Sequence, residues 1–276
     1  MEYVRLLTIA GSDSGGGAGV QADLKTFAAL GVHGMSVITA LTAQNTVGVS
    51  GIHDVPPDFV AAQLEAVFTD IGVDAVKIGM LSHEAVIRAV AAVLVREQPR
   101  HVVLDPVMLA TSGEALLRDR DVGVLASELM PMASVITPNL PEASRLLGRD
   151  VGNGSDMETA AVALLSLGCR AVLIKGGHAG LDSCDDVLAW RNGTVVRTRR
   201  YHGKRVDTHN THGTGCTLSA AIAAYLGRGL DLVDAVHAAK QYLEGALRAG
   251  AAYRLGRGHG PLGHFYGPTA RGGQVS

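Results

Sequence analysis

At residues 210–221 the chain reads Asn210-Thr211-His212-Gly213-Thr214-Gly215-Cys216-Thr217-Leu218-Ser219-Ala220-Ala221, a polar loop that runs into small residues typical of a helix. Glycines let a backbone turn its N–H groups inward and let an oxygen approach closely. The amino end of a helix carries partial positive charge, so this segment predicts a site for a phosphoryl group or an oxyanion. Cys216 falls in the first turn, where the pKa of a thiol is expected to be lowered. The alternative is a tight loop holding a small buried cysteine.

Around this segment, apolar β-branched runs alternate with amphipathic stretches of helical period. Such apolar strands between helices predict an α/β domain with a mostly parallel sheet that is covered on both faces. A turn at Asn192-Gly193 between short strands predicts an antiparallel edge. Residues 1–266 are expected to form one domain, and residues 267–276 a flexible tail. The expected strands cover 6–10, 36–41, 75–78, 102–104, 135–137 and 172–175, and the expected helices 18–30, 58–70, 83–96, 156–167, 215–226 and 232–247.

Composition excludes several classes of protein. The 24 basic and 26 acidic residues leave a formal charge of -2 without a long run of like charge, so neither nucleic acid nor an anionic membrane is expected as a partner. No apolar stretch approaches the roughly 20 residues of a membrane span, and no signal-peptide pattern opens the chain. Three scattered cysteines without metal spacing predict a reducing cytoplasmic location.

The residues that follow the predicted strands are rich in Gly, Asn, Asp and Pro. In parallel sheets ligands bind at the carboxyl ends of the strands, so these residues are the candidates for a site. The first loop, from Gly15 to Ala22, contains Gly-x-Gly-x-x-Ala, which weakly suggests a dinucleotide fold. The acidic residue expected about 20 positions later is missing, and Gly-Lys-Ser/Thr of a P-loop is absent as well.

Three further strand ends carry charged or hard-oxygen groups. Asn139 and Glu142 lie three apart at a helix start, which suits either Mg²⁺ and its bound waters or an ordinary helix cap. Lys175 ends a strand before two glycines and suits either a phosphate contact or a lysine that reaches solvent. Asp105 precedes Pro106 and suits either a metal or phosphate contact through water or a turn.

Together these segments resemble the ribokinase-like kinases, from about Leu7 to about Phe265. Gly213-Thr214-Gly215-Cys216 is similar to their anion-hole signature, Gly-x-Gly-Asp, with cysteine in place of aspartate. This cysteine form resembles the hydroxymethylpyrimidine and phosphomethylpyrimidine kinases of thiamine biosynthesis. Further segments match that family in order: Ile9-Ala10-Gly11-Ser12-Asp13, Gly17 to Thr26, Val37 to Thr46, Lys77-Ile78-Gly79-Met80-Leu81, Asp105-Pro106-Val107-Met108, Thr137 to Ala143 and Lys175-Gly176-Gly177-His178.

The resemblance implies a ribokinase-like three-layer α/β/α sandwich that phosphorylates a pyrimidine alcohol and then its monophosphate, using ATP and Mg²⁺. The family often forms dimers, so a homodimer is expected. The catalytic group would comprise Cys216, Lys175, Gly213 and Gly215. The phosphates would contact Thr214, Asn139, Glu142 and Asp105, with Glu142 and Asn139 ordering the metal through water.

The same resemblance places the substrate pocket at the first glycine loop. The Gln44 amide both donates and accepts hydrogen bonds, as an aminopyrimidine edge requires, although it could also serve its own loop. Met80 and Val107 would supply apolar walls, with core packing as the alternative. Asp23 would meet the same ligand unless it is simply exposed, and the expected substrate set is completed by Gly11 and Ala18. Met35, Met108, Met130 and Met132 are interpreted as core residues, and His178 and His212 as solvated or packing residues.

Three other functions compete with this interpretation. A pyridoxal or pyridoxine kinase of the same superfamily has a similar hydroxymethyl heteroaromatic substrate. A non-catalytic ligand sensor could have kept the pocket, although Asn139, Glu142, Lys175 and Cys216 are all intact. A dinucleotide oxidoreductase ranks last, because its acidic residue is missing. The sequence leaves two possibilities for the catalytic base. A Cys216 thiolate could accept the substrate proton, or the transfer could be largely dissociative and need only a weak base.

Overall fold

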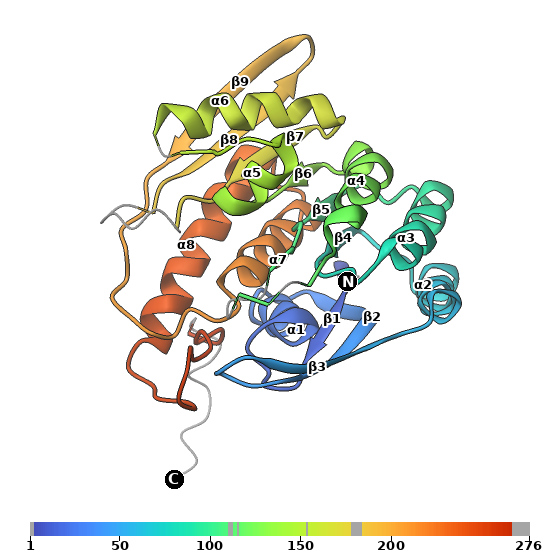
Figure 1. Ribbon diagram of the computed structural model, residues 1–276, viewed down its shortest axis with the longest axis horizontal. Helices are drawn as coiled ribbons and strands as arrows, with labels where there is room; N and C mark the ends of the chain where they lie inside the picture. The colour runs from blue at the N-terminus through green and yellow to red at the C-terminus, as the bar shows by residue number, and fades with distance from the viewer. Residues whose placement is uncertain (1–2, 110–112, 115, 153, 178–183, 267–276) are drawn as a thin grey trace.

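The computed structural model describes residues 3–109, 113–114, 116–152, 154–177 and 184–266. Within these ranges a nine-stranded sheet has the order β3-β2-β1-β4-β5-β6-β7-β8-β9 and lies between two layers of helices (Figure 1). The six strands in the middle run parallel, and the strands at both edges run antiparallel. The three-layer fold with a mostly parallel sheet is thereby confirmed. The tail expected at 267–276 lies outside the described residues, as does His178.

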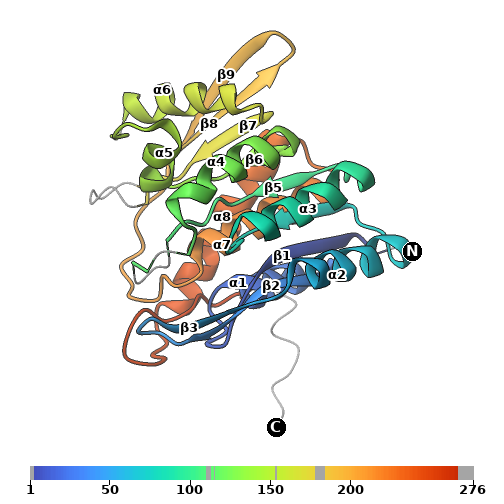
Figure 2. The same cartoon turned by 45° about the vertical axis from the view of Figure 1, so that its right-hand side comes forward.

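The strands follow the apolar runs of the sequence. They are β1 (Arg5–Asp13), β2 (His33–Gln44), β3 (Val49–Asp54), β4 (Ala75–Ile78), β5 (Val102–Leu104), β6 (Val135–Ile136), β7 (Ala171–Ile174), β8 (Asp186–Asn192) and β9 (Val195–Tyr201). The turn between β8 and β9 contains Gly193 with a φ of +63°, which confirms the predicted antiparallel edge. A second antiparallel edge, formed by β3, was missed. Figure 2 shows these hairpins at opposite ends of the sheet.

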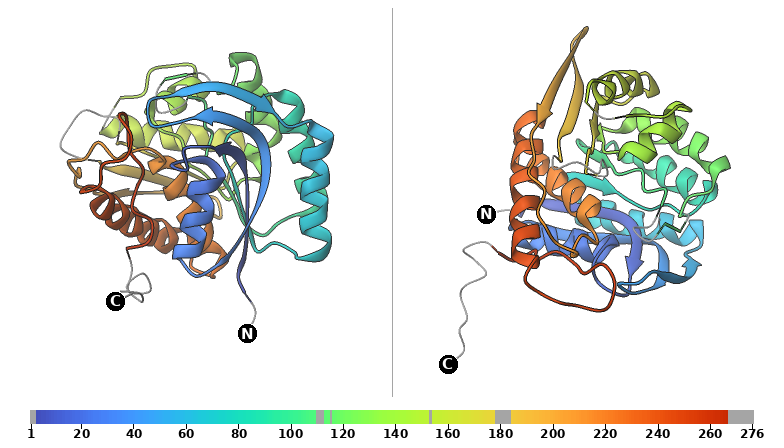
Figure 3. Two further views of the ribbon diagram at one scale, coloured as in Figure 1. Left: turned by 90° about the horizontal axis from the view of Figure 1, so that it is seen from below. Right: turned by 60° about the vertical axis from the view of Figure 1, so that its left-hand side comes forward.

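The helices divide between the two faces of the sheet (Figure 3). One face is covered by α1 (Gly19–Ala29), α7 (Thr214–Gly227) and α8 (Leu232–Gly250), which share a buried cluster with the sheet. The other face is covered by α2 (Pro57–Asp70), α3 (Glu84–Glu97), α4 (Asp119–Glu128), α5 (Leu140–Leu147) and α6 (Ser155–Leu164). None of the helices in the described ranges combines the length and the hydropathy that a membrane crossing needs.

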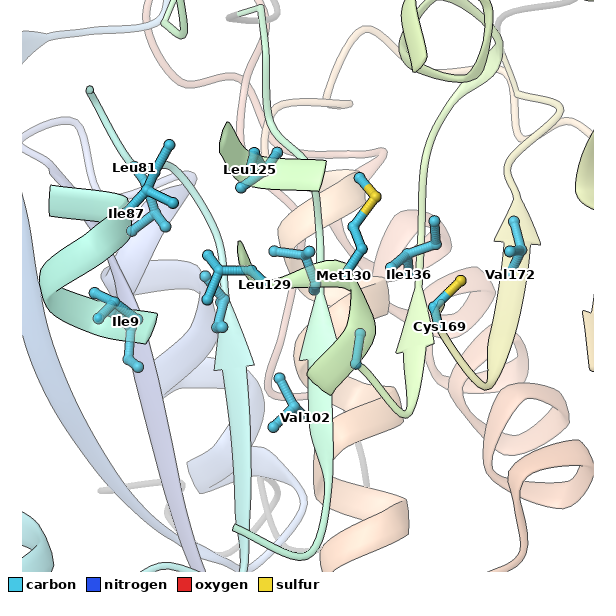
Figure 4. Packing of buried hydrophobic residues seen from close by; sticks show 14 of the residues in the cluster. Ile9, Leu81, Ile87, Val102, Leu125, Leu129, Met130, Ile136, Cys169 and Val172 are labelled. Carbon is cyan, nitrogen blue, oxygen red and sulfur yellow. The ribbon is translucent and has the colours of Figure 1, made fainter. Parts of the chain in front are cut away.

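A second buried cluster lies between the sheet and helices α2 to α6, and it shows how the apolar strands pack. Met130 and Cys169 pack beside Ile136 and Val172 of neighbouring strands (Figure 4). Met35, Met108 and Met130 are buried and Met132 packs against the same cluster, so their interpretation as core residues is confirmed. Because both faces of the sheet are sealed in this way, a ligand can enter only at a strand end.

Candidate active site

The carboxyl ends of the parallel strands open into a cavity of about 830 Å³. Its walls come from the loops after β1, β2, β4, β5, β6 and β7, from the start of β8 and the end of β9 with the segment that follows it, and from α7, α8 and His259. The fold therefore brings together segments that lie up to about 250 residues apart in the chain. The sequence-predicted residues that line it are Gly11, Ala18, Gln44, Met80, Asp105, Val107, Asn139, Glu142, Lys175, Gly213, Thr214, Gly215 and Cys216.

Asp23 is the predicted site residue that does not line this cavity. It lies one turn into α1, and its side chain is fully buried. Its Oδ2 atom accepts hydrogen bonds from Thr8 Oγ1 at 2.6 Å and from Lys77 Nζ at 2.8 Å. The alternative that Asp23 is simply exposed is therefore wrong, and Lys77 and Thr8 occupy its carboxylate at the edge of the cavity.

The glycine-rich helix start has the backbone geometry that the sequence predicts. Gly213 is the N-cap of α7, and its φ of +87° is in the left-handed region that favours glycine. A Cβ atom at this position would overlap the carbonyl oxygen of Gly17, so the first glycine loop and the anion-hole loop are in direct contact. The first turn of α7 consequently lines the cavity directly after a turn that favours glycine.

Gly213→Ala is expected to destabilise the protein by more than the roughly 1–2 kcal/mol that left-handed backbone alone costs an alanine. The excess arises because the new methyl group must displace the Gly17 carbonyl. Gly229→Ala is a matched control, since Gly229 has a φ of +91° but no atom within 4 Å of an added Cβ. Thermal unfolding measures both variants. Equal losses of stability would show that the contact with Gly17 is not tight.

Cys216 lines the cavity in the first turn of α7, but its thiol differs from the sequence-based expectation. Burial raises the pKa of the thiol to about 11, and the carboxylates of Asp23 and Asp105 add to the effect. Lys77 and the backbone N–H of Gly19 act in the opposite direction. The prediction of a lowered pKa is wrong, because desolvation outweighs the helix end and the nearby cation.

Lys175, which follows β7, forms an ion pair with Asp105, which follows β5; β6 lies between these two strands. Lys175 Nζ lies 2.7 Å from Asp105 Oδ1, and that oxygen also accepts a hydrogen bond from Thr137 Oγ1 at 3.0 Å. Burial opposes the charge on Lys175, yet Asp105 and Glu142 raise the pKa of its ammonium. A permanently charged ammonium thus faces the cavity beside the start of α7, where an added Cβ on Gly215 would lie 3.3 Å from its Nζ atom.

Asn139 and Glu142 form a complete capping box at the start of α5. Asn139 Oδ1 accepts the Glu142 N–H at 2.9 Å, and Glu142 Oε2 accepts the Asn139 N–H at 2.8 Å. Burial raises the pKa of Glu142 to about 7. The helix-cap alternative is therefore present in the structure. It does not remove the residues from the cavity, since a carboxylate that accepts the N–H groups of Asn139 and Met108 keeps lone pairs for water.

Two side chains without an assigned role in the sequence organise the substrate loop. Asp13 is buried, and its carboxylate accepts the backbone N–H groups of Gly15, Gly17 and Ala18 at 2.8–2.9 Å. His212 Nε2 lies 2.9 Å from Asp13 Oδ2 and 3.3 Å from Gln44 Nε2. His212 is thus buried and not solvated, and its ring joins the anion-hole loop to Asp13 and Gln44. The signal for Asp13 was available, since it is an acidic residue at the end of a strand.

A family model and the sequences of known proteins point to the same kinase family. A model of the phosphomethylpyrimidine kinase family matches residues 13–263. The hydroxymethylpyrimidine/phosphomethylpyrimidine kinase of Rhizobium meliloti (strain 1021) is 53% identical over 261 residues, which cover 94% of this chain and 96% of that protein. The Escherichia coli (strain K12) kinase of the same description is 49% identical over 267 residues, covering 96% and 99%.

Solved structures of kinases are similar to this chain in both sequence and fold. The crystal structure of phosphomethylpyrimidine kinase from Clostridium difficile 630 has a TM-score of 0.76 at 43% identity, covering 87% of this chain and 97% of that one. The Bacillus subtilis pyridoxal kinase, solved as an ADP complex, has a TM-score of 0.86 at 37% identity, covering 96% and 98%. Pyridoxal kinases are therefore structural relatives at lower sequence identity.

The sandwich and its strand-end cavity, with a glycine turn, a lysine and a capped carboxylate, define a small-molecule kinase of the ribokinase-like class. The chain belongs to the hydroxymethylpyrimidine/phosphomethylpyrimidine kinase family, the phosphotransferases of thiamine biosynthesis. The resemblance found in the sequence is thereby confirmed.

Proposed function

We propose that this chain transfers the γ-phosphoryl group of ATP to the hydroxymethyl oxygen of 4-amino-5-hydroxymethyl-2-methylpyrimidine, and then phosphorylates the resulting monophosphate to the pyrophosphate. The observation that carries the proposal is the meeting of Gln44, Lys175 and the amino end of α7 in one cavity. These groups can bind a polar heterocycle at one side and phosphate charge at the other.

Each of these residues has its own role in the phosphoryl transfer. The hydroxymethyl oxygen forms a bond to the γ-phosphorus, the bond from that phosphorus to the β–γ bridging oxygen breaks, and ADP leaves. The N–H groups between Gly213 and Cys216 and the ammonium of Lys175 stabilise the charge on the phosphoryl oxygens. The Cys216 thiolate accepts the hydroxyl proton. Little covalent help is needed, because phosphoryl transfer depends mainly on positioning and charge neutralisation.

Mg²⁺ fits the residues present if it is held mainly by phosphates and water. Among the described residues, no group of three or more His, Cys, Asp or Glu side chains is arranged to hold a metal ion. Magnesium usually keeps several waters and takes one or two protein oxygens, which Glu142 and Asn139 supply at the cavity wall. The ion would neutralise phosphate charge beside Lys175.

Gln44 is proposed to recognise the aminopyrimidine edge, with Gly11, Ala18, Met80 and Val107 around the ring. Its Nε2 atom lies 3.3 Å from His212 Nε2, and its Oε1 atom lies 3.0 Å from the Thr42 hydroxyl, whose proton it shares with the Ser12 carbonyl. This preorganisation supports a specificity role over simple loop hydrogen bonding.

Gln44→Ala is expected to raise the KM for the pyrimidine alcohol about tenfold, the usual effect of losing one or two hydrogen bonds. The KM for ATP should stay unchanged. Gln63→Ala is the matched control, since the Gln63 amide bonds the backbone of Ile38 away from the cavity. Steady-state kinetics measure both constants. An equal rise in both KM values would contradict a specific pyrimidine contact.

A coupled ADP assay tests the function directly, with hydroxymethylpyrimidine, its monophosphate and pyridoxal side by side, each with and without Mg²⁺. The proposal expects Mg²⁺-dependent ADP formation with both pyrimidines and a lower kcat/KM with pyridoxal. A preference for pyridoxal would establish the pyridoxal kinase alternative. Absence of ADP with every alcohol would establish a ligand sensor.

Two further expectations are retained as proposals. A homodimer is supported by the exposed edge strand β3, where Ile52 is 44% exposed and the neighbouring strand presents Leu41 at 47%. A cytoplasmic location is supported by three free cysteines at positions 169, 184 and 216.

A further inference from the structure

The segment 256–264, called the strap below, follows α8 and lies beside the turn between β2 and β3 (Figure 1; Figure 3, left). All of its residues are described, and none lies in a helix or a strand. Residues 256–259 are exposed, so burial of apolar surface does not explain their position. The position of this part of the strap must therefore come from its polar contacts.

The first contact is with Thr46, in the turn between β2 and β3. The backbone N–H groups of Arg257 and Gly258 both donate to Thr46 Oγ1, at 3.2 Å each. Gly256 has a φ of +70°, and an added Cβ there would lie 2.1 Å from the same Oγ1 atom. A Cβ on Gly258 would lie 2.0 Å from the Thr46 carbonyl oxygen. The two glycines therefore allow the strap backbone to approach Thr46 closely.

The second contact is with the anion-hole loop and the helix that begins there. The His212 N–H donates to the carbonyl oxygen of Gly260 at 3.0 Å, and His212 forms a parallel bridge with Pro261. Further along the strap, His264 Nε2 lies 3.0 Å from Thr217 Oγ1 of α7, and both side chains are buried. The strap is thus fixed to the anion-hole side of the cavity at two places.

These contacts connect the two sides of Gln44. Thr46 follows Gln44 by two residues, and the His212 ring lies 3.3 Å from Gln44 Nε2. Gln44 and His212 line the cavity, whereas Thr46 does not. The strap bonds to Thr46 and to the His212 backbone, so it ties the turn that carries Gln44 to the loop that precedes α7.

We propose that the strap sets the spacing between Gln44 and the anion-hole loop, and that Thr46 is the positioning residue through which it does so. The inference rests on the proposed function, in which Gln44 binds the pyrimidine ring while the hydroxymethyl oxygen meets the phosphoryl group. Both contacts are made at once only at one spacing, and a misplacement of about 1 Å is costly. Weak binding follows when only a fraction of the molecules holds Gln44 in place.

Thr46→Val removes the acceptor of the two strap hydrogen bonds and keeps the shape of the side chain. We expect the KM for the pyrimidine alcohol to rise about five- to tenfold, as for the loss of one or two hydrogen bonds, while the KM for ATP stays unchanged. Thr46→Ser keeps the hydroxyl and should resemble the wild type. Steady-state kinetics measure these constants. An unchanged KM for the pyrimidine in Thr46→Val, or an equal rise in both KM values, would overturn the proposal.

Gly256→Ala disturbs the same contact from the strap side, because its methyl group must displace the Thr46 hydroxyl. It should give the same selective rise in the KM for the pyrimidine. Gly31→Ala is the matched control, since Gly31 has a φ of +72° but no atom within 4 Å of an added Cβ. If Gly31→Ala raises this KM as much as Gly256→Ala does, the effect is one of general stability and the proposal fails.

Hydrogen exchange of the full chain, followed by mass spectrometry of the peptides that cover 45–48 and 256–260, tests the contact without substrate. Thr46→Val should speed exchange in both peptides about five- to tenfold, and Thr46→Ser should not. Unchanged exchange in Thr46→Val would show that the strap does not hold the turn. If the wild type phosphorylates no pyrimidine, the proposed function fails, and the exchange rates still decide whether the strap holds the turn that carries Gln44.

Discussion

Cys216→Ala should lower kcat by about 10²–10⁴ with little change in either KM, the usual contribution of a positioned general base. The sulfur lies in the first turn of α7, beside the N–H groups that would hold the phosphoryl oxygens. Removing it takes away the proton acceptor but leaves the glycine turn and Lys175. The loss should therefore appear in turnover and not in substrate binding.

The pH profile makes this prediction specific. Because the pKa of the Cys216 thiol is about 11, the thiolate fraction falls tenfold for each pH unit below that value. Wild-type kcat should consequently rise with pH between about 7 and 10, and the profile of Cys216→Ala should be flat. Cys169→Ala is the control, since Cys169 lies in the core and its Sγ contacts the Leu164 carbonyl. Near-normal turnover of Cys216→Ala would contradict the base assignment and leave the anion hole unaffected.

Lys175→Met is expected to reduce kcat by about 10²–10³, as when one group that stabilises transition-state charge is removed. It should also destabilise the fold by roughly 3–5 kcal/mol, because Asp105 is left buried without its cation. A loss of turnover could then have two causes. The positive charge of Lys175 beside the phosphoryl group is missing, or the unpaired Asp105 distorts the active site. The single variant cannot separate these causes.

The double variant Lys175→Met with Asp105→Asn separates them. The neutral amide no longer needs a cation, so thermal unfolding should return toward the wild-type temperature. Turnover should stay low, since the charge beside the transferring phosphoryl group is still missing. Recovery of kcat in the double variant would show that Lys175 acts only by neutralising Asp105.

Short apolar strands were the most predictable elements. The strands at 75–78 and 102–104 match the sequence prediction residue for residue, because buried parallel strands need unbroken apolar side chains and end where these stop. The edge strand β3 was missed because its residues are mostly exposed and alternate poorly. Helix α4 was missed, and for α5 only the start at Asn139 and Glu142 was predicted, without its extent. α5 has only eight residues and begins directly after the capping residue Asn139, within a segment interpreted as a loop.

The resemblance of the motifs to a known family determined the family and the three-layer fold. The sequence also determined which segments meet at the cavity, because parallel strands bring their carboxyl ends to one edge and the residues that follow successive strands must converge. The glycine turn before Cys216 was readable for the same local reason, since only glycine accepts its backbone geometry.

Only the tertiary structure decided the electrostatics of the site. The thiol of Cys216 has a raised pKa, and Asp23 is buried in an ion pair with Lys77, because distant segments desolvate these groups and pair their charges. Helix position predicts a local dipole, but desolvation and ion pairing depend on which side chains of β4, β5 and β7 pack against it. The glycine-rich helix start thus predicts where a phosphate would bind, and the charges packed behind it set the pKa of its cysteine.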